Sequence, residues 1–393
     1  FGNRFLVEGR PLPMNFRGWN EDDDTNIDFA NSMDWEILDL PLYLTGGNFM
    51  TDGYGMAFST ELMINENNIN ESAFIEIAQD QLHIDSYYIF DNPNESSIQH
   101  IDCMAKLVNP ETIIIKEVDP SSPEYDCIED FADSFYELNT FYNRPFNIHR
   151  IYCPVIPGAF WEVNPVAAYT NSLIINKKVL VPQYGIAEDE LAINTYHEAM
   201  PGYEVIGFNE DPSNPWYAED ALHCRTIGIF NPEMMHISHK SIRNEEITDN
   251  NINIEAEILD YSQNPYNLNS ATVEWKYSFE LEFQRSFELT HTQSNHYIGS
   301  FPLLYPNSEI NYFILVDNIN NDTLSHPIEG WHTFTTVNGM VGDLNSDSEI
   351  NVLDVILIVN LILTNQYHLA ADLNSDNEIN VLDIITIVNI IID

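Results

Sequence analysis

The stretch Ile113-Ile114-Ile115-Lys116-Glu117-Val118 begins with three β-branched residues and is apolar at four of its six positions. Such a short apolar run is typical of a buried β-strand. Residues 125–136, which follow it, carry their apolar side chains on one face of a helix. The pattern continues as a hairpin at residues 172–182 that turns at Asn176-Lys177, a helix at residues 188–200, and a strand at residues 203–208. Strands that alternate with helices indicate an α/β domain, which we place at residues 1–240.

The hydrophobic period changes to two after about residue 242. Residues 272–279 and 312–316 are strand-like, and apolar side chains alternate with polar ones at Ile252, Ile254, Ala256 and Ile258. This pattern predicts a β-sandwich of immunoglobulin-like type over residues 241–338.

A duplicated acidic motif fills the C-terminal segment, residues 339–393, and its second copy follows the first after 29 residues. Each copy is a loop with oxygen-bearing side chains at fixed spacing, and each runs into an apolar helix, at residues 355–363 and 384–392. Calcium takes six to eight oxygen ligands, and this spacing wraps them around one ion. A polar acidic turn would explain one copy, but two copies in register favour calcium loops. The predicted ligands are Asp343, Asn345, Asp347, Glu349, Asn351 and Asp354 in the first loop, and Asp372, Asn374, Asp376, Glu378, Asn380 and Asp383 in the second.

This duplicated segment resembles a type I dockerin module. It departs from an EF-hand loop at position six, where Ser348 and Asn377 replace glycine, and at position twelve, where aspartate replaces glutamate. Dockerins bind cohesin modules, so the resemblance implies a cohesin-type partner and a role in docking. Together with the appended sandwich, it also implies an extracellular or cell-surface location.

The charge of the chain excludes some classes of partner. Lys and Arg number 14 against 62 Asp and Glu, which gives a net charge of −48. Such a surface disfavours nucleic acid and anionic membranes, and it suits cations and arginine-bearing peptides. The longest apolar run, residues 355–363, is far shorter than the roughly 20 residues of a membrane-spanning helix.

A cysteine and a distant histidine form the first candidate for catalysis. Cys224 could serve as a nucleophile and His100 as its acid–base partner. The alternative is a buried apolar cysteine and a structural histidine. The other cysteines, Cys103, Cys127 and Cys153, are expected to be core residues or to form a disulfide.

Five ordered motifs give these residues a context. They are TGGNFMTDG at residues 45–53, HIDC at 100–103, YTNSL at 169–173, AMPGYE at 199–204 and DALHCRT at 220–226. Together they resemble the bacterial, porphyromonad-type peptidylarginine deiminases, which are relatives of the agmatine deiminases. That family has the pentein fold, a pseudo-fivefold α/β propeller of ββαβ modules, and an immunoglobulin-like domain follows it in the peptidylarginine enzymes. The resemblance therefore implies a partial pentein at residues 1–240.

The resemblance also implies roles for four residues. Cys224 would attack the guanidinium carbon of arginine, and His100 would protonate the departing ammonia and then activate water. Asp102 would bind the guanidinium, because a carboxylate accepts two parallel N–H bonds from its planar fork. If residues 100–102 are extended, His100 and Asp102 lie on one face. Asn171 would support the reaction centre. The product would be peptidyl-citrulline plus ammonia, formed through a cysteine thiouronium without a catalytic cofactor.

Two departures concern the beginning of the chain. The family carries a Trp-x-Arg-Asp-x-Gly-Pro stretch, whose aspartate is a second guanidinium ligand, upstream of the position that Phe1 occupies here. We therefore expect an N-terminally truncated form, and activity without that segment stays open. The family's Arg-Pro-Arg-Pro stretch, which binds the carboxylate of a C-terminal arginine, reads Arg10-Pro11-Leu12-Pro13 here. The resemblance thus implies that Arg10 binds substrate, with a weakened preference for C-terminal arginine.

Two other functions remain open at this point. One is a non-catalytic, degenerate deiminase scaffold that is displayed or docked through its dockerin. The other is an agmatine deiminase that acts on a small molecule. Thr45 favours the peptidyl branch, because agmatine deiminases have glutamate at that position. Gly46, Gly47 and Asn48 are expected to shape a turn rather than to touch substrate.

Overall fold

The computed structural model divides the chain into two compact units, Phe1–Pro232 and Glu233–Asp393, which are considered separately below. It describes residues 27–392 except residues 36–39, 93–98, 157–165, 212–215, 217–219, 227, 229–230, 232–233, 245–246, 248–251, 262–267, 303, 305–307, 337–341, 346, 348, 365, 375 and 377. Within these described ranges, no helix combines the length and the apolar character needed to cross a membrane.

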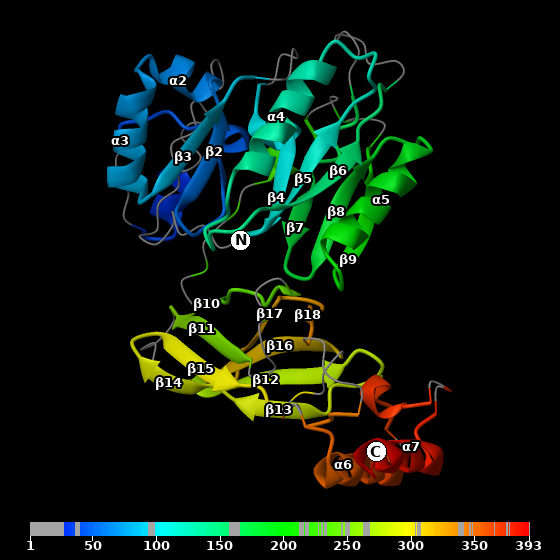
Figure 1. Ribbon diagram of the computed structural model, residues 1–393. Helices are drawn as coiled ribbons and strands as arrows, with labels where there is room; N and C mark the ends of the chain where they lie inside the picture. Colours follow the sequence, from blue (N-terminus) through cyan, green and yellow to red (C-terminus); the bar gives the residue numbers. More distant parts are fainter. Residues whose placement is uncertain are drawn as a thin grey trace. The chain divides into compact units, whose positions relative to one another are not determined.

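The described residues of the first unit contain three copies of one ββαβ arrangement, which follow one another from blue through cyan to green in Figure 1. In each copy, an antiparallel hairpin is followed by helix and then by a strand parallel to the second hairpin strand. The first copy consists of β1 (Met50–Thr51), β2 (Met56–Thr60), α2 (Leu62–Asn67), α3 (Glu71–Leu82) and β3 (Ser86–Phe90). The second consists of β4 (Ala105–Asn109), β5 (Thr112–Glu117), α4 (Tyr125–Glu137) and β6 (Asn147–Tyr152). The third consists of β7 (Leu173–Ile175), β8 (Lys178–Gln183), α5 (Glu188–Ala199) and β9 (Glu204–Asn209).

The isoleucine run of β5 joins the cores of neighbouring copies. Ile113 and Ile115 pack into a cluster with Phe58 of β2 and with the phenylalanines of α4. Ile114 points to the opposite face and packs into a cluster with α5 and β8. Because successive side chains of a strand alternate between faces, a strand buried on both faces must be apolar throughout. This double burial explains why the run is nearly continuous.

Three of the five sequence motifs contain a single-turn 3-10 helix. These helices are η2 (Gly46–Asn48), η3 (Ile101–Cys103) and η4 (His223–Arg225). The helix η2 contacts both η3 and η4, although the three are far apart in the sequence.

The second unit begins with two antiparallel sheets that share one apolar core. The predicted alternation is confirmed, since Ile254, Ala256 and Ile258 are all buried. One sheet has the order β10 (Met235–Ser238), β11 (Asn253–Asp260), β15 (His296–Ser300) and β14 (Thr290–Gln293). The other has the order β13 (Arg285–Glu288), β12 (Leu268–Tyr277), β16 (Glu309–Asn318) and β17 (Thr323–His326), with β18 (His332–Thr335) also beside β16.

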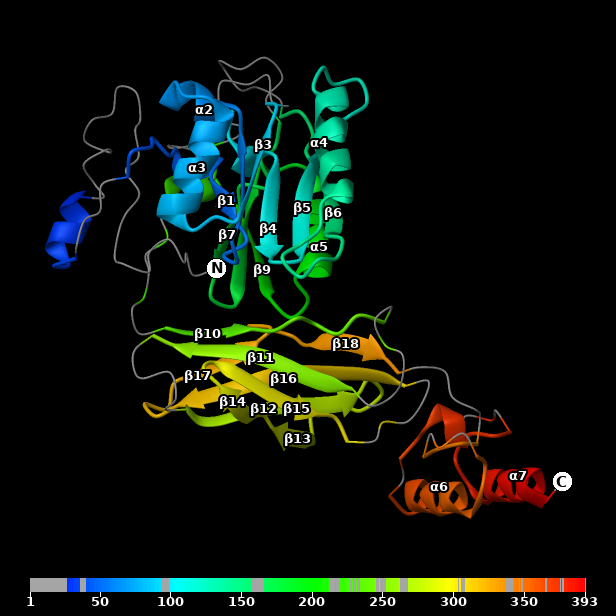
Figure 2. The same cartoon turned by 60° about the vertical axis from the view of Figure 1, so that its left-hand side comes forward.

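The C-terminal repeat forms two helices, α6 (Val352–Thr364) and α7 (Val381–Ile392), which lie side by side in Figure 2. Both begin three residues before their predicted starts. The reason is local, because Asn351 and Asn380 accept a hydrogen bond at 2.8 Å from the amides of Leu353 and Leu382, as helix N-caps do. Ile358, Leu361 and Ile387 fill the core between the two repeats.

Candidate active site

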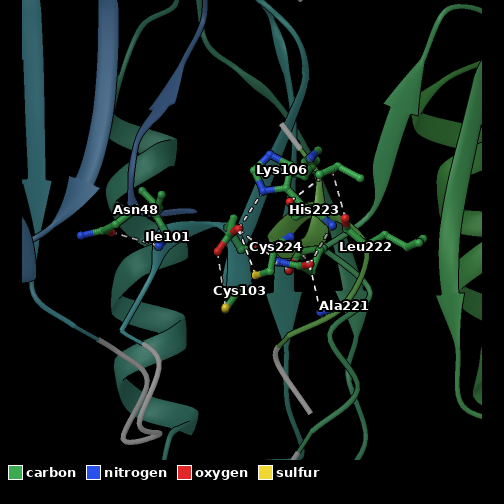
Figure 3. Close-up of polar contacts among 12 residues, drawn as sticks. Asn48, Ile101, Cys103, Lys106, Ala221, Leu222, His223 and Cys224 are labelled. Carbon is green, nitrogen blue, oxygen red and sulfur yellow. Dashed lines mark hydrogen bonds and ion pairs between the residues drawn. The ribbon is translucent and has the colours of Figure 1, made fainter. Parts of the chain in front are cut away.

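The predicted site begins at η3, where one expectation is wrong. His100 has extended backbone, but residues 101–103 turn into a 3-10 helix, so His100 and Asp102 do not alternate along a strand. The turn is fixed by Ile101, which is fully buried and donates its amide at 3.1 Å to the Asn48 side-chain oxygen. Figure 3 shows this link between η2 and η3.

His100 and Asp102 nevertheless approach the same point, above Gly47. A Cβ atom at Gly47 would lie 2.8 Å from His100 Nδ1 and 2.9 Å from Asp102 Oδ2. The turn predicted for Gly46, Gly47 and Asn48 is therefore present as η2, and the absence of a side chain at Gly47 lets the two groups meet there.

The carboxylate of Asp102 is buried and receives several hydrogen bonds. Its Oδ2 lies 2.7 Å from His223 Nδ1 and 3.1 Å from Asn171 Nδ2, and it accepts the Cys224 thiol at 3.7 Å. Burial alone would raise the pKa of Asp102, but the hydrogen bond and charge of His223, with the charges of His100 and Lys106, hold it below its usual value. Asp102 is therefore ionised at neutral pH.

Asn171 connects the remaining parts of the site and is fully buried. Its Oδ1 accepts the backbone amides of Ala221, His223 and Cys224 at 3.0–3.2 Å. Its Nδ2 lies 3.1 Å from Cys224 Sγ as well as contacting Asp102. One amide side chain thus holds the η4 backbone and keeps the sulfur close to the carboxylate. Figure 3 shows the held segment from Ala221 to Cys224.

The thiol and the imidazole are both neutral in this arrangement. Burial and the Asp102 carboxylate raise the pKa of the Cys224 thiol, against the hydrogen bond from Asn171. Burial lowers the pKa of His100, although Asp102 and Glu66 oppose the shift. A neutral imidazole can accept a proton, and a cation bound near Asp102 would favour the thiolate.

Sequence reasoning missed His223 and Lys106, and it assigned Asn48 to a turn without predicting its contact with η3. His223 contacts Asp102, and Asn48 holds η3. Lys106 donates to the backbone oxygen of Ser172 at 2.8 Å, and burial lowers its pKa to about 8 while the charges of Asp102 and Cys224 oppose the shift. His223 and Asn48 lie inside the motifs at residues 220–226 and 45–53, so the motifs were a signal that they belong to the site. Lys106 lies in none of the motifs, and no such signal in the sequence pointed to it. Arg10, the predicted carboxylate ligand, lies outside the described residues.

No disulfide joins any of the four cysteines, all of which lie in the described residues, so the disulfide alternative is wrong. Cys103 and Cys153 are buried, as expected of core residues, but Cys127 is exposed on α4. Cys224 is exposed as a whole residue, but its sulfur packs against the polar side chains of Asn171 and Asp102, which contradicts the alternative that it is a buried apolar residue.

The two acidic loops repeat each other contact for contact. Asp354 Oδ1 accepts the amide of Leu344 at 2.7 Å, and Asp383 Oδ1 accepts that of Leu373 at 2.9 Å. Asp343, Asp354, Asp372 and Asp383 are all at most 5% exposed, and residues 341–393 contain no Lys or Arg. Within the described part of the chain, no group of three or more His, Cys, Asp or Glu side chains is arranged as a metal centre.

The raised pKa of Cys224 predicts a pH-dependent thiol reactivity. Because the thiolate is the reactive form, alkylation of Cys224 by iodoacetamide should be slow at neutral pH and should accelerate as the pH rises. Peptide mass spectrometry of timed samples measures this rate, with the exposed Cys127 in the same digest as a reference. Alkylation of Cys224 that is fast and independent of pH around neutrality would contradict the neutral thiol.

Comparisons with known proteins bear on this geometry. The family model for Porphyromonas-type peptidyl-arginine deiminase matches residues 4–229, and the type I dockerin model matches residues 341–392. Putative agmatine deiminases of Lactococcus lactis and Enterococcus faecalis are each 28% identical, over 47% of this chain and 56% of the relative. The chain thus spans about half the length of the curated relatives it matches.

Solved structures of similar proteins include a putative arginine deiminase from Porphyromonas gingivalis, at 24% identity and a TM-score of 0.46, covering 54% of this chain and 67% of that one. An agmatine deiminase of Enterococcus faecalis is similar at 23% identity and a TM-score of 0.46, covering 56% of this chain and 66% of that one.

Proposed function

Because the chain belongs to the Porphyromonas-type peptidyl-arginine deiminase family and carries a type I dockerin domain, we propose that it hydrolyses the guanidino group of peptidyl-arginine to citrulline and ammonia. The observation that carries this proposal is the contact of Cys224 Sγ with Asn171 and the ionised Asp102. A nucleophile beside a buried carboxylate suits a cationic, planar substrate, because the carboxylate binds the cation next to the attacking atom.

The reaction begins with transfer of the Cys224 proton to a base, for which neutral His100 is suited. The thiolate attacks the guanidinium carbon, and the C=N electron pair moves onto nitrogen. His100 returns the proton to the departing nitrogen, so ammonia leaves and a thiouronium remains on Cys224. Water then attacks the same carbon, His100 takes its proton, and the C–S bond breaks to release citrulline and the thiol.

Asp102 and Asn171 act on charge and geometry in this scheme. Asp102 holds the guanidinium nitrogens, and the bound positive charge lowers the pKa of the Cys224 thiol at the moment when the thiolate is needed. Asn171 keeps the sulfur close to the carboxylate through its contacts at 3.1 Å with both groups. Arg10 would bind a substrate carboxylate, as the family resemblance implies.

A second candidate is deimination of agmatine, since the curated relatives are named putative agmatine deiminases. Thr45, whose hydroxyl donates to Glu66 at 2.9 Å, favours the peptidyl substrate because agmatine deiminases carry glutamate at this position. An assay of ammonia and citrulline release separates the two, with a C-terminal arginine peptide, an internal arginine peptide, free arginine and agmatine as substrates. Turnover of agmatine alone would move the chain to the small-molecule branch. No turnover of any of them would leave a non-catalytic scaffold.

The domain scheme is part of the proposal. Three ββαβ copies in the first unit support a partial pentein over residues 1–240. Two antiparallel sheets on one core support an immunoglobulin-like sandwich, which includes β10 (Met235–Ser238) and therefore begins before the expected residue 241, and the paired helices support a dockerin module over residues 339–393.

Calcium is the ion that we propose for the two acidic loops. Burying a carboxylate costs free energy unless a cation lies nearby. Four aspartates of the two loops are at most 5% exposed, and residues 341–393 contain no Lys or Arg that could pair with them. Their donors are carboxylate and amide oxygens, which suit a hard divalent cation. When bound, calcium would be held by the twelve predicted ligands and would fix each loop against its helix.

Calorimetry tests this proposal directly, and we expect about two calcium ions per chain with a rise in the unfolding temperature. Asp354→Asn and Asp383→Asn should each remove about one ion, because each takes one carboxylate from one loop. The exposed Asp133 of α4 provides a control in Asp133→Asn, which should bind as the unmodified chain does. Absence of heat, with no gain in thermal stability, would reject calcium.

A cohesin-type partner and an extracellular or cell-surface location complete the proposal. The two repeats expose matching apolar side chains, at Val352 and Val381, Leu353 and Leu382, and Ile356 and Ile385, all more than half exposed. Apolar side chains that remain exposed on a small module are typical of a protein-binding surface.

A further inference from the structure

His223 makes the shortest contact of the candidate site and has no role in the scheme above. Its Nδ1 lies within hydrogen-bond distance of Asp102 Oδ2, at 2.7 Å, although the two residues are 121 positions apart in the sequence. The side chain of Asp102 is only 6% exposed, whereas that of His223 is 36% exposed. His223 therefore reaches a buried carboxylate from a position at the edge of the site.

The backbone of His223 is fixed independently of this contact. Its amide lies 3.0 Å from Asn171 Oδ1 and 3.1 Å from the Asn171 backbone oxygen. Asn171 also contacts Asp102 Oδ2 and Cys224 Sγ. Asn171 therefore holds the backbone of His223, whose imidazole contacts Asp102, and also holds the sulfur of Cys224.

The orientation of the Asp102 carboxylate depends on the hydrogen-bond donors around it. Its Oδ2 faces the Asn171 amide and the Cys224 thiol, and its Oδ1 accepts the Cys103 thiol at 3.5 Å. Thiols are weak donors, so the two strong donors are the amide of Asn171 and the imidazole of His223. Loss of a partner from a buried charged group costs more than the hydrogen bond itself contributes.

We infer that His223 is a positioning residue, which orients the Asp102 carboxylate toward the guanidinium of the substrate through its Nδ1–H group. This inference rests on the proposed function, because it assigns His223 to the reaction at the same site. His223 itself touches neither the sulfur nor the substrate in this role.

The atom that makes the contact allows a sharp test. In asparagine, Nδ2 stands at the same number of bonds from Cα as Nδ1 of histidine, whereas the glutamine nitrogen stands one bond further out, as Nε2 does. His223→Asn should therefore keep the hydrogen bond to Asp102, and His223→Gln and His223→Leu should lose it. The exposed His197 of α5 offers a matched control, His197→Leu.

Binding of benzoyl-arginine amide by calorimetry is the first readout, with the full chain carrying Cys224→Ala in every variant so that the probe is not consumed. At neutral pH we expect His223→Leu and His223→Gln to weaken binding by about tenfold. His223→Asn should stay within about threefold of the parent, and His197→Leu should equal it. Circular dichroism establishes that each variant is folded.

The pH dependence of this binding separates positioning from a purely structural role. The pKa of Asp102 is held low by His223, so loss of that partner raises it. Cation binding needs the carboxylate form, so the decline of affinity with falling pH should begin at higher pH in His223→Leu than in the parent. The other charged or titratable groups around the carboxylate are His100, Lys106 and Cys103, and they are the same in every variant.

Three results would overturn the inference. Equal or tighter binding in His223→Leu would make His223 a competitor for Asp102. An equal loss of affinity in His223→Asn and His223→Leu would mean that the hydrogen bond at the Nδ1 position does not determine substrate binding. An unchanged pH dependence in His223→Leu would leave a structural role only.

Failure of the proposed function is recognised separately. If the parent binds no benzoyl-arginine amide and releases no ammonia, the deiminase assignment fails, and the contact is then tested without ligand. His223→Leu and Asp102→Asn, singly and together, form a double-mutant cycle of unfolding temperatures. If His223 positions Asp102, the unfolding temperature of the double variant should fall by less than the sum of the falls in the two single variants. Additive falls in unfolding temperature would overturn the inference.

Discussion

Replacing Cys224 with alanine is expected to abolish citrulline and ammonia formation, with a fall in kcat of at least about a thousandfold. The reason is chemical, because the thiouronium cannot form without the sulfur. The folded structure should tolerate the change, since Asn171 Oδ1 holds the backbone amides of Ala221, His223 and Cys224 rather than the thiol. Colorimetric detection of citrulline and coupled detection of ammonia, on arginine peptides, measure the loss.

The matched control is Cys127→Ala, because Cys127 is a free and exposed thiol on α4. It should keep the full rate. Binding of benzoyl-arginine amide should survive in Cys224→Ala, since Asp102 remains. Citrulline formation that persists in Cys224→Ala at a comparable rate would remove Cys224 from the reaction.

The second large effect is expected for Asp102→Asn, which keeps the shape of the side chain and removes its charge. We expect kcat/KM to fall by at least about a hundredfold, because a neutral amide cannot pair with the guanidinium cation. The same change should lower the pKa of the Cys224 thiol, since the Asp102 carboxylate is one of the groups that raise it. Alkylation of Cys224 at neutral pH should therefore become faster while turnover becomes slower.

These opposite changes make the test specific. A variant that was merely misfolded would lose turnover and would expose all of its cysteines alike. Asp102→Asn should instead accelerate alkylation of Cys224 and leave that of Cys127 unchanged. Full turnover in Asp102→Asn, or slower alkylation of Cys224, would contradict the role given to this carboxylate.

Regular periodicity made much of the fold predictable. The strand at Ile113–Ile115, the helices α4 and α5 and the hairpin at Asn176-Lys177 all carry patterns that the structure confirms. The recurrence of ββαβ units in this chain was not visible from periodicity, because the first strand of the first unit, β1, spans only two residues. Strands that short hold no complete alternation.

Four residues of the site were predictable from the sequence, but their contacts and the residues that support them were not. Cys224, His100, Asp102 and Asn171 were assigned through motifs. In the structure His100 and Asp102 lie at η3 and Cys224 lies in η4, and the buried Asn171 contacts both Asp102 and Cys224. The turn at Ile101–Cys103 was missed because one 3-10 turn is too short to leave a periodic signal. The contact of His223 with Asp102 spans 121 residues, and only tertiary packing brings such residues together.

The most direct test of the account is detection of the covalent intermediate on Cys224. The unmodified protein is mixed with an arginine peptide, quenched in acid within milliseconds to minutes so that the thiouronium is trapped before water attacks it, digested and analysed by mass spectrometry. The account predicts that the Cys224 peptide gains the mass of the substrate minus ammonia, while the peptides of Cys103, Cys127 and Cys153 remain unmodified. Citrulline that forms without any adduct on Cys224, or with an adduct on another cysteine, would contradict it.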